Sequence, residues 1–159
     1  MNPKSETSVF CHKYKACPEG RKFASRYATM ADCYEALLAG CAGRPSADWA
    51  AWAYTRGGVV THRKLCKFAA FCVAHVKRHI KECSGPISPW YIGEFGSCCI
   101  LLDALQENNI SNESSVYTIA YVTRSLTWWE DDGYAKWQLE YLNKQKNPFK
   151  KCKFERKMK

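Results

Sequence analysis

The sequence predicts an all-α protein: a compact bundle of five or six helices cross-linked by disulfides. Two observations carry this prediction. Apolar residues recur at spacings of three and four along most of the chain, which is the period of a helix with one buried face. Ten cysteines are spread over 159 residues, and none of them has the C-x2-C spacing of a zinc site. An even number of dispersed cysteines is typical of disulfide-bonded proteins of an oxidising compartment.

All ten cysteines are therefore expected to pair. They are Cys11, Cys17, Cys33, Cys41, Cys66, Cys72, Cys83, Cys98, Cys99 and Cys152. The chain is long enough to bury a normal core, so each disulfide is expected to add about 2–4 kcal/mol to a domain that already has one. That domain covers residues 1–147, and a basic tail at 148–159 follows, which pairing of Cys152 would pin to the body.

The first predicted helix covers residues 18–40 and ends at Gly40, a natural C-terminal stop. Its apolar stripe consists of Phe23, Tyr27, Met30, Tyr34, Leu37 and Cys41. Ser46 is the predicted N-cap of a short helix with Trp49 and Trp52 on one side, which the pair of glycines at 57–58 ends.

Two longer helices are predicted next. Thr61 is the expected cap of a helix that runs to about Cys83. After the Ser-Gly-Pro break at 84–86, Ser88 and Pro89 have the residue types of an N-cap and a first helical position. The expected buried face of this helix consists of Ile92, Phe95, Cys99, Leu102 and Leu105. Cys98 lies about 100° round the helix from Cys99, so these two neighbours are expected to have different partners.

The region 116–142 has two interpretations. Residues 116–127 are rich in β-branched and aromatic side chains, which suits a strand, but their apolar spacing also fits a helix. Thr127 and Glu130 match a capping box, and acidic residues follow at the expected helix start. The alternative is an α+β fold with a hairpin that turns at Asp132-Gly133. We favour the helix, because one internal glycine costs it only about 1 kcal/mol.

No catalytic or cofactor site is evident, so the sequence predicts a protein that is not an enzyme and needs no cofactor. His75 and His79 lie one helical turn apart and are weak metal candidates, because no further ligand stands near them in the sequence. A cysteine nucleophile is not expected when every cysteine has a disulfide partner. The Glu130 to Asp132 run is better explained by a helix N-terminus than by a metal site.

Charge is distributed unevenly along the chain, whose net charge is +9. Residues 1–93 are basic, residues 94–143 are acidic, and residues 144–159 are strongly basic. Clustered lysines and arginines bind polyanions by releasing counterions, so the tail predicts a site for sulfated glycosaminoglycan, and nucleic acid is not an expected partner. The candidate residues are Lys150, Lys151, Lys153, Arg156, Lys157 and Lys159.

Other features favour a secreted, glycosylated protein. Asn109 and Asn112 begin consecutive N-glycosylation sequons in a polar run. The first residues lack the apolar core of a signal peptide, so we expect a mature chain from which a signal has been removed. No apolar run is long enough for a transmembrane helix. Trp128 and Trp129 are adjacent, so at least one of them is expected to be exposed as an anchor for a protein interface.

The spacing of cysteines from Leu65-Cys66 through Cys83 to Cys98-Cys99, followed by a helical half and a late cysteine, resembles helical cysteine-rich secreted domains of nematodes and arthropods, including tick salivary proteins. The resemblance covers about half the chain. It implies an extracellular, non-enzymatic protein, in some cases one directed at a host's proteins, and it transfers no functional residues.

Together these observations predict a secreted binding protein that engages an extracellular protein or a polyanion. A membrane-active antimicrobial or toxin that uses basic charge and aromatic residues is one alternative. A carrier of a small apolar ligand held between helices is another.

Overall fold

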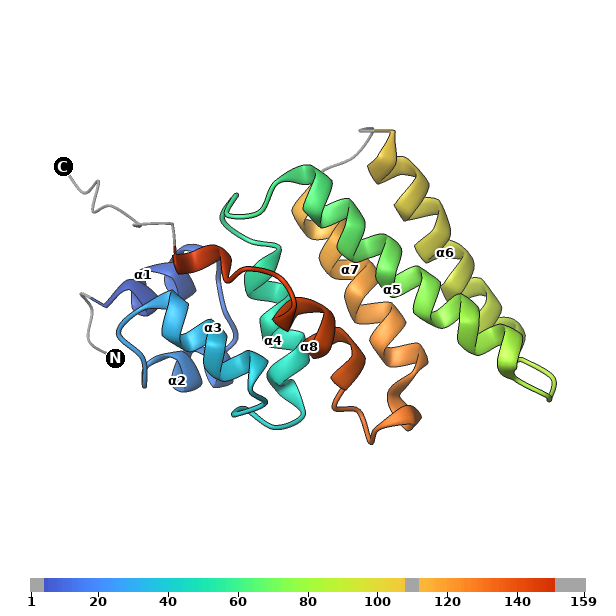
Figure 1. Cartoon of the computed structure of the whole chain (residues 1–159), viewed down its shortest axis with the longest axis horizontal. Coiled ribbons are helices and arrows are strands. Elements are labelled where there is room, and N and C mark those ends of the chain that lie inside the picture. Colours follow the sequence, from blue (N-terminus) through green and yellow to red (C-terminus); the bar gives the residue numbers. More distant parts are fainter. Residues whose placement is uncertain (1–4, 108–111, 151–159) are drawn as a thin grey trace.

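A computed structural model describes residues 5–107 and 112–150, and within these ranges the chain is all-helical, with eight α-helices, two short 3-10 helices and no strand (Figure 1). The α-helices are α1 (Glu6–Lys13), α2 (Pro18–Ala24), α3 (Met30–Leu38), α4 (Pro45–Tyr54), α5 (His62–Glu82), α6 (Pro89–Gln106), α7 (Asn112–Leu126) and α8 (Lys136–Asn143). The 3-10 helices are η1 (Trp128–Glu130) and η2 (Pro148–Lys150). The predicted fold class is confirmed at this level.

The long helices α5, α6 and α7 pack side by side at one end of the molecule, and the short helices α1, α2 and α3 form the other end (Figure 1). Helices α4 and α8 lie between the two ends and contact each other. One large apolar cluster runs through both ends and includes the fully buried rings of Phe10, Tyr34, Tyr54 and Phe68. Burial of this continuous core is the main source of stability.

One buried hydrogen bond and one buried aromatic ring hold the C-terminal segments α8 and η2 on this core. Gln138 of α8 is fully buried, and its side-chain amide donates a hydrogen bond of 2.8 Å to the Ala120 carbonyl of α7. Phe149 of η2 is also buried, and its ring lies 5.6 Å from Phe10 and 5.3 Å from Tyr34. The chain is therefore packed against the core as far as η2.

The single helix predicted for residues 18–40 is wrong, because the structure divides this segment into α2 and α3. The chain leaves the helix after Ala24 and re-enters it at Met30. Thr29 is the N-cap of α3, and its hydroxyl accepts a hydrogen bond of 3.1 Å from the Asp32 amide. The apolar stripe continues across this break because Tyr27 packs on Phe23 from the connecting turn, with ring centroids 5.4 Å apart.

Of the helix starts predicted at Ser46, Thr61 and Ser88, the last two are confirmed and the first is wrong. Helix α5 follows Thr61, and α6 follows Ser88, whose hydroxyl accepts a hydrogen bond of 3.2 Å from the Tyr91 amide. Ser46 is not an N-cap, because α4 already begins at Pro45, whose fixed φ suits the first position of a helix. The Ser46 hydroxyl instead accepts a hydrogen bond from the Ala42 amide.

The predicted buried face of α6 is only partly right. Leu105 is buried, but Ile92 is 55% exposed, and the buried cysteine is Cys98 rather than Cys99. Helices α5 and α7 both pack on α6, so its buried surface is rotated from the face that periodicity alone indicates.

The region 116–142 is helical, so the predicted hairpin is wrong. The favoured helix beginning at Thr127 is also wrong, because η1 and a tight turn separate α7 from α8. Asp132, Gly133 and Ala135 have φ values of 56°, 81° and 48°, which a continuous helix does not permit. The Asp131 carboxylate instead caps α8 by accepting hydrogen bonds from the amides of Ala135 and Lys136, at 2.8 and 2.6 Å.

The structure leaves the predicted disulfides unconfirmed. No two of the nine cysteines in the described ranges lie at disulfide distance in this structure. Cys152 lies outside the described residues.

We predict that Phe68→Ala lowers the free energy of unfolding by about 3–5 kcal/mol, because it removes a fully buried ring and leaves a cavity. The Phe68 ring contacts Tyr54 and Tyr141, with centroids 5.6 and 5.4 Å away. Chemical denaturation measures the change. Lys67→Ala, at an exposed position one residue away, is the control and is expected to change stability by less than about 0.5 kcal/mol. Equal effects of the two substitutions would contradict the described core.

Candidate functional site

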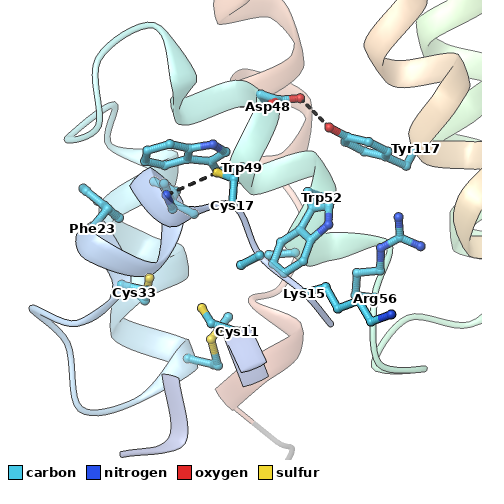
Figure 2. A pocket seen from close by; sticks show the side chains of 16 residues that line it. Cys11, Lys15, Cys17, Phe23, Cys33, Asp48, Trp49, Trp52, Arg56 and Tyr117 are labelled. Carbon is cyan, nitrogen blue, oxygen red and sulfur yellow. Dashed lines mark hydrogen bonds between the residues drawn. The ribbon is translucent and has the colours of Figure 1, made fainter. Parts of the chain in front are cut away.

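A cavity of about 280 Å³ lies where α1, α2, α3, α4 and α7 meet (Figure 2). Its walls come from these five helices, from the loop between α1 and α2, and from the turn after α4 that carries Arg56. The lining residues are Cys11, Lys15, Ala16, Cys17, Gly20, Phe23, Ala24, Met30, Cys33, Leu37, Asp48, Trp49, Trp52, Ala53, Arg56 and Tyr117. A concave, mainly apolar space with a few polar groups is the usual form of a small-molecule site.

The start of α2 shapes one wall of the cavity. Cys17 is the N-cap of this helix, and its sulfur accepts a hydrogen bond of 3.3 Å from the Gly20 amide. A Cβ atom on residue 20 would lie 3.2 Å from that sulfur and 3.8 Å from the Trp49 ring. Glycine at this position therefore leaves the space in front of Trp49 open.

Aromatic rings form the apolar wall. Trp49 packs against Phe23 with ring centroids 5.7 Å apart, and Trp52 meets Phe10 edge to face at 5.8 Å. Both tryptophans are half-buried, so each keeps part of its indole surface free of protein. Large, rigid aromatic surfaces of this kind provide much apolar contact area for a ligand.

Asp48 organises the polar side of the cavity. Its carboxylate accepts a hydrogen bond of 2.9 Å from the Tyr117 hydroxyl and forms an ion pair with Arg124 (Figure 2 shows the contact with Tyr117). Burial raises the pKa of Tyr117, and the adjacent negative charge of Asp48 raises it further. The phenol is therefore protonated at neutral pH and remains a hydrogen-bond donor.

Two cations at the edge of the cavity form no ion pair with a carboxylate among residues 5–107 and 112–150. Lys15 and Arg56 both line it, and the Arg56 guanidinium lies 5.6 Å from the centre of the Tyr117 ring. Arg124 already compensates the charge of Asp48. The cavity thus combines an aromatic interior with a positively charged edge.

Burial keeps the two buried thiols of the cavity, Cys11 and Cys33, protonated at neutral pH. Burial raises the pKa of Cys11 to about 11 and that of Cys33 to about 12, and the neighbouring Cys11 contributes to the second value. Both side chains are therefore neutral and act as small apolar groups in the cavity wall.

The predicted polyanion site falls almost wholly outside the described residues. Lys150 is described, and its ammonium lies 2.6 Å from the Glu35 carboxylate at the surface. The other candidates, Lys151, Lys153, Arg156, Lys157 and Lys159, lie in the undescribed range 151–159. Of the two sequon asparagines, Asn109 also lies outside the described residues and Asn112 is the first residue of α7. Polyanion binding and glycosylation stay predictions.

The predicted interface tryptophans are both exposed. Trp128 and Trp129 in η1 are 60% and 45% exposed, and Trp90 at the start of α6 is 65% exposed. The ring of Trp129 lies 6.0 Å from Tyr91, the neighbour of Trp90. Exposed tryptophans therefore gather at the end of the three-helix layer formed by α5, α6 and α7.

The structure gives His75 and His79 a common partner, Glu130. The Nε2 atom of His75 lies 2.8 Å from one carboxylate oxygen, and the Nδ1 atom of His79 lies 3.1 Å from the other. Among residues 5–107 and 112–150, no group of three or more histidine, cysteine or acidic side chains is arranged to hold a metal ion. In these same ranges, no helix combines the length and apolar character required to cross a membrane.

Sequence reasoning missed the cavity, although it placed Trp49 and Trp52 on one side of a helix. The other residues that line the cavity come from elements far apart in the chain. No local spacing in the sequence indicates that Asp48 contacts Tyr117.

Comparison with models of known protein families, with curated proteins and with solved structures found no match.

Proposed function

We propose that this chain is a carrier of a small, mainly apolar ligand with an anionic end, such as a medium-chain or aromatic carboxylic acid. The observation that carries the proposal is the cavity of about 280 Å³, with Trp49 and Trp52 in its wall and Lys15 and Arg56 at its edge. The aromatic wall suits the apolar body of such a ligand, and charge-assisted hydrogen bonds suit its carboxylate. No covalent step is needed for this activity.

The exposed tryptophans support a second function, which is binding of an extracellular protein. Tryptophan is enriched among the residues that dominate protein interfaces. Trp90, Trp128 and Trp129 present large apolar surfaces on neighbouring segments. This surface is at the η1 end of α5, α6 and α7, away from the cavity, so both functions are compatible.

We also propose that the protein is secreted and that part of its cysteines form disulfides there. Cys72 and Cys98 are our candidates for one pair, although their sulfurs would have to approach each other from the separation seen in the structure. Both are buried, they belong to the packed helices α5 and α6, and Cys98 contributes to the raised pKa of Cys72, of which burial is the main cause.

Ligand binding is tested by titrating the protein with decanoate and with decanol while following tryptophan fluorescence. Replacing Lys15 and Arg56 together by glutamine is expected to weaken decanoate binding about tenfold or more, because contacts to the carboxylate are lost. Decanol binding is expected to stay unchanged. Lys13→Gln, at an exposed position that does not line the cavity, is the control.

A second variant, Gly20→Val, is expected to weaken both ligands, since its side chain would enter the cavity beside Trp49. Absence of binding by the unaltered protein would contradict the proposal. So would decanoate affinity that survives the loss of both cations.

Protein binding is tested with the double variant Trp90→Ala and Trp128→Ala. Immobilised wild-type protein is expected to retain a partner from extracellular fluid, and the double variant is expected to lose it, because the two rings are the most exposed tryptophans. Lys67→Ala serves as the surface control. Equal retention by wild type and double variant would exclude the tryptophans as the interface.

Disulfide formation is tested by peptide mapping of secreted protein without reduction. We predict a link between Cys72 and Cys98, whose reduction lowers the free energy of unfolding by about 3 kcal/mol through the loop it closes. Chemical denaturation with and without reductant measures this difference. A free Cys72, or its link to a different cysteine, would contradict the pairing.

A further inference from the structure

A second cluster of reactive groups lies far from the cavity, where the end of α5 meets η1 and the start of α6. Cys83 is the C-cap of α5 and is exposed. Its sulfur lies 3.7 Å from the Nε2 atom of His79, and the Nδ1 atom of the same ring lies 3.1 Å from a carboxylate oxygen of Glu130. One imidazole thus bridges a thiol and a carboxylate.

This order of groups is that of an activated nucleophile. A nucleophilic side chain within reach of a base, with the base oriented by a third group, is the recurring arrangement in covalent catalysis. A neutral His79 that donates its Nδ1 proton to Glu130 has Nε2 free to accept the proton of Cys83.

Glu130 is itself held in place. Its second carboxylate oxygen accepts a hydrogen bond of 2.8 Å from the Nε2 atom of His75. The His75 ring stacks on Trp137 at 4.0 Å and 7°, and its Nδ1 atom lies 3.1 Å from the Arg78 guanidinium. The side chains of His75, His79 and Glu130 are only 11%, 22% and 25% exposed. The carboxylate is therefore fixed before any reaction takes place.

Tyr91 adds a polar group to the same cluster. Its side chain is largely buried, and its hydroxyl has no hydrogen-bond partner among the described residues. Burial raises the pKa of Tyr91 to about 12, and charge at Cys83 and Glu130 contributes to this shift. The ring of Trp129 lies 5.4 Å from His79 and 6.0 Å from Tyr91, so an exposed indole borders these two rings of the cluster.

A second cysteine–histidine pair, on α5, has no carboxylate within the described residues like the one that orients His79, and therefore serves as a comparison. Cys66 lies 3.4 Å from the Nε2 atom of His62, with the same spacing in the chain as Cys83 and His79. In the described part of the chain, no carboxylate binds His62. Burial also raises the pKa of Cys66. Of these two described pairs, only the one at the end of α5 combines an exposed thiol with a base that a carboxylate orients.

We propose that Cys83, His79 and Glu130 form a nucleophilic thiol site that reacts with low-molecular-weight disulfides. His79 takes the thiol proton, and the Cys83 sulfur attacks one sulfur of the disulfide. A new bond forms between Cys83 and that sulfur as the original S–S bond breaks. The second sulfur leaves as a thiolate and takes the proton from His79, so that Cys83 is oxidised and the released thiol is reduced.

A disulfide fits this cluster better than an acyl substrate. Attack on a disulfide needs a base that removes the thiol proton and an acid that protonates the leaving sulfur. His79 can act as both. Acyl transfer also needs donors placed around an oxyanion. The Tyr91 hydroxyl is an unpaired donor in the described cluster, but no hydrogen bond joins it to the Cys83 sulfur, whose contact there is with His79. The proposal goes beyond ligand and protein binding, because it assigns covalent chemistry to a separate site.

The test is the rate at which oxidised glutathione modifies each cysteine of natively purified protein at neutral pH, measured by peptide mass spectrometry. A thiol of ordinary reactivity is only a few per cent ionised at that pH. Because His79 can remove the proton of Cys83, this thiol is expected to react about tenfold faster than Cys41. Cys41 is also exposed but has no histidine partner in the described structure. Cys66 is expected to react more slowly than Cys83.

Three variants separate chemical from structural effects. His79→Ala is expected to reduce the rate at Cys83 to that of Cys41, and added imidazole is expected to restore it. Glu130→Gln is expected to lower the rate at Cys83 about threefold in the wild-type background. In the His79→Ala background it is expected to have no effect, because Glu130 is a positioning residue that acts through the imidazole of His79. The rates at Cys41 and Cys66 are expected to stay constant throughout.

Several results would overturn the proposal: a Cys83 that reacts no faster than Cys41, a rate that is insensitive to His79→Ala, or a loss that imidazole does not restore. A change of all cysteine rates together would assign His79 a structural role. Cys83 found in an intramolecular disulfide of the native protein would also exclude the site.

Discussion

The carboxylate of Asp48 makes the polar contact that joins the central helix α4 to α7 of the long-helix end. It lies on α4 and binds two groups of α7, the Tyr117 hydroxyl and the Arg124 guanidinium. The Arg124 side chain is 11% exposed, so loss of its partner would leave a largely buried cation without compensation. Because Tyr117 also lines the cavity, the contact that joins α4 to α7 also fixes the cavity's polar wall.

The same contact determines the charge that a ligand meets. Asp48 is the acidic residue in the cavity lining, and Arg124 compensates it from outside that lining. Lys15 and Arg56, which pair with no carboxylate in the described part of the chain, then place positive charge beside an aromatic interior. The attraction between these cations and an anionic group of a ligand is strong only where water is partly excluded. The aromatic walls of the cavity exclude water on one side.

The parts of the fold that could be predicted from the sequence are those set by local chemistry. Thr61 and Ser88 stand directly before helix starts, and Ser88 also makes the capping hydrogen bond that its residue type predicts from a few neighbouring residues. The break between α2 and α3 could not be found in this way, since Tyr27 continues the apolar stripe from a turn. The cavity was equally hidden, because its walls meet only through tertiary packing. Glu130 shows the same limit: its position suggested a helix cap, whereas the fold places it between His75 and His79, which lie 55 and 51 residues earlier in the chain.

The cysteines show why composition alone does not assign chemistry. Cys33 and Cys72 are buried, and their pKa values are raised to about 12, so they behave as apolar side chains. Cys83 is exposed and contacts an imidazole that a fixed carboxylate orients. Its position follows from the packing of α5 on α6 and α7, because His79 belongs to α5, Tyr91 to α6, and Glu130 follows the end of α7. The proposed bond between Cys72 and Cys98 would link α5 to α6 without using the thiol of Cys83. Structural cysteines and a reactive cysteine can thus coexist in one helical layer, separated by burial and by the groups each sulfur meets.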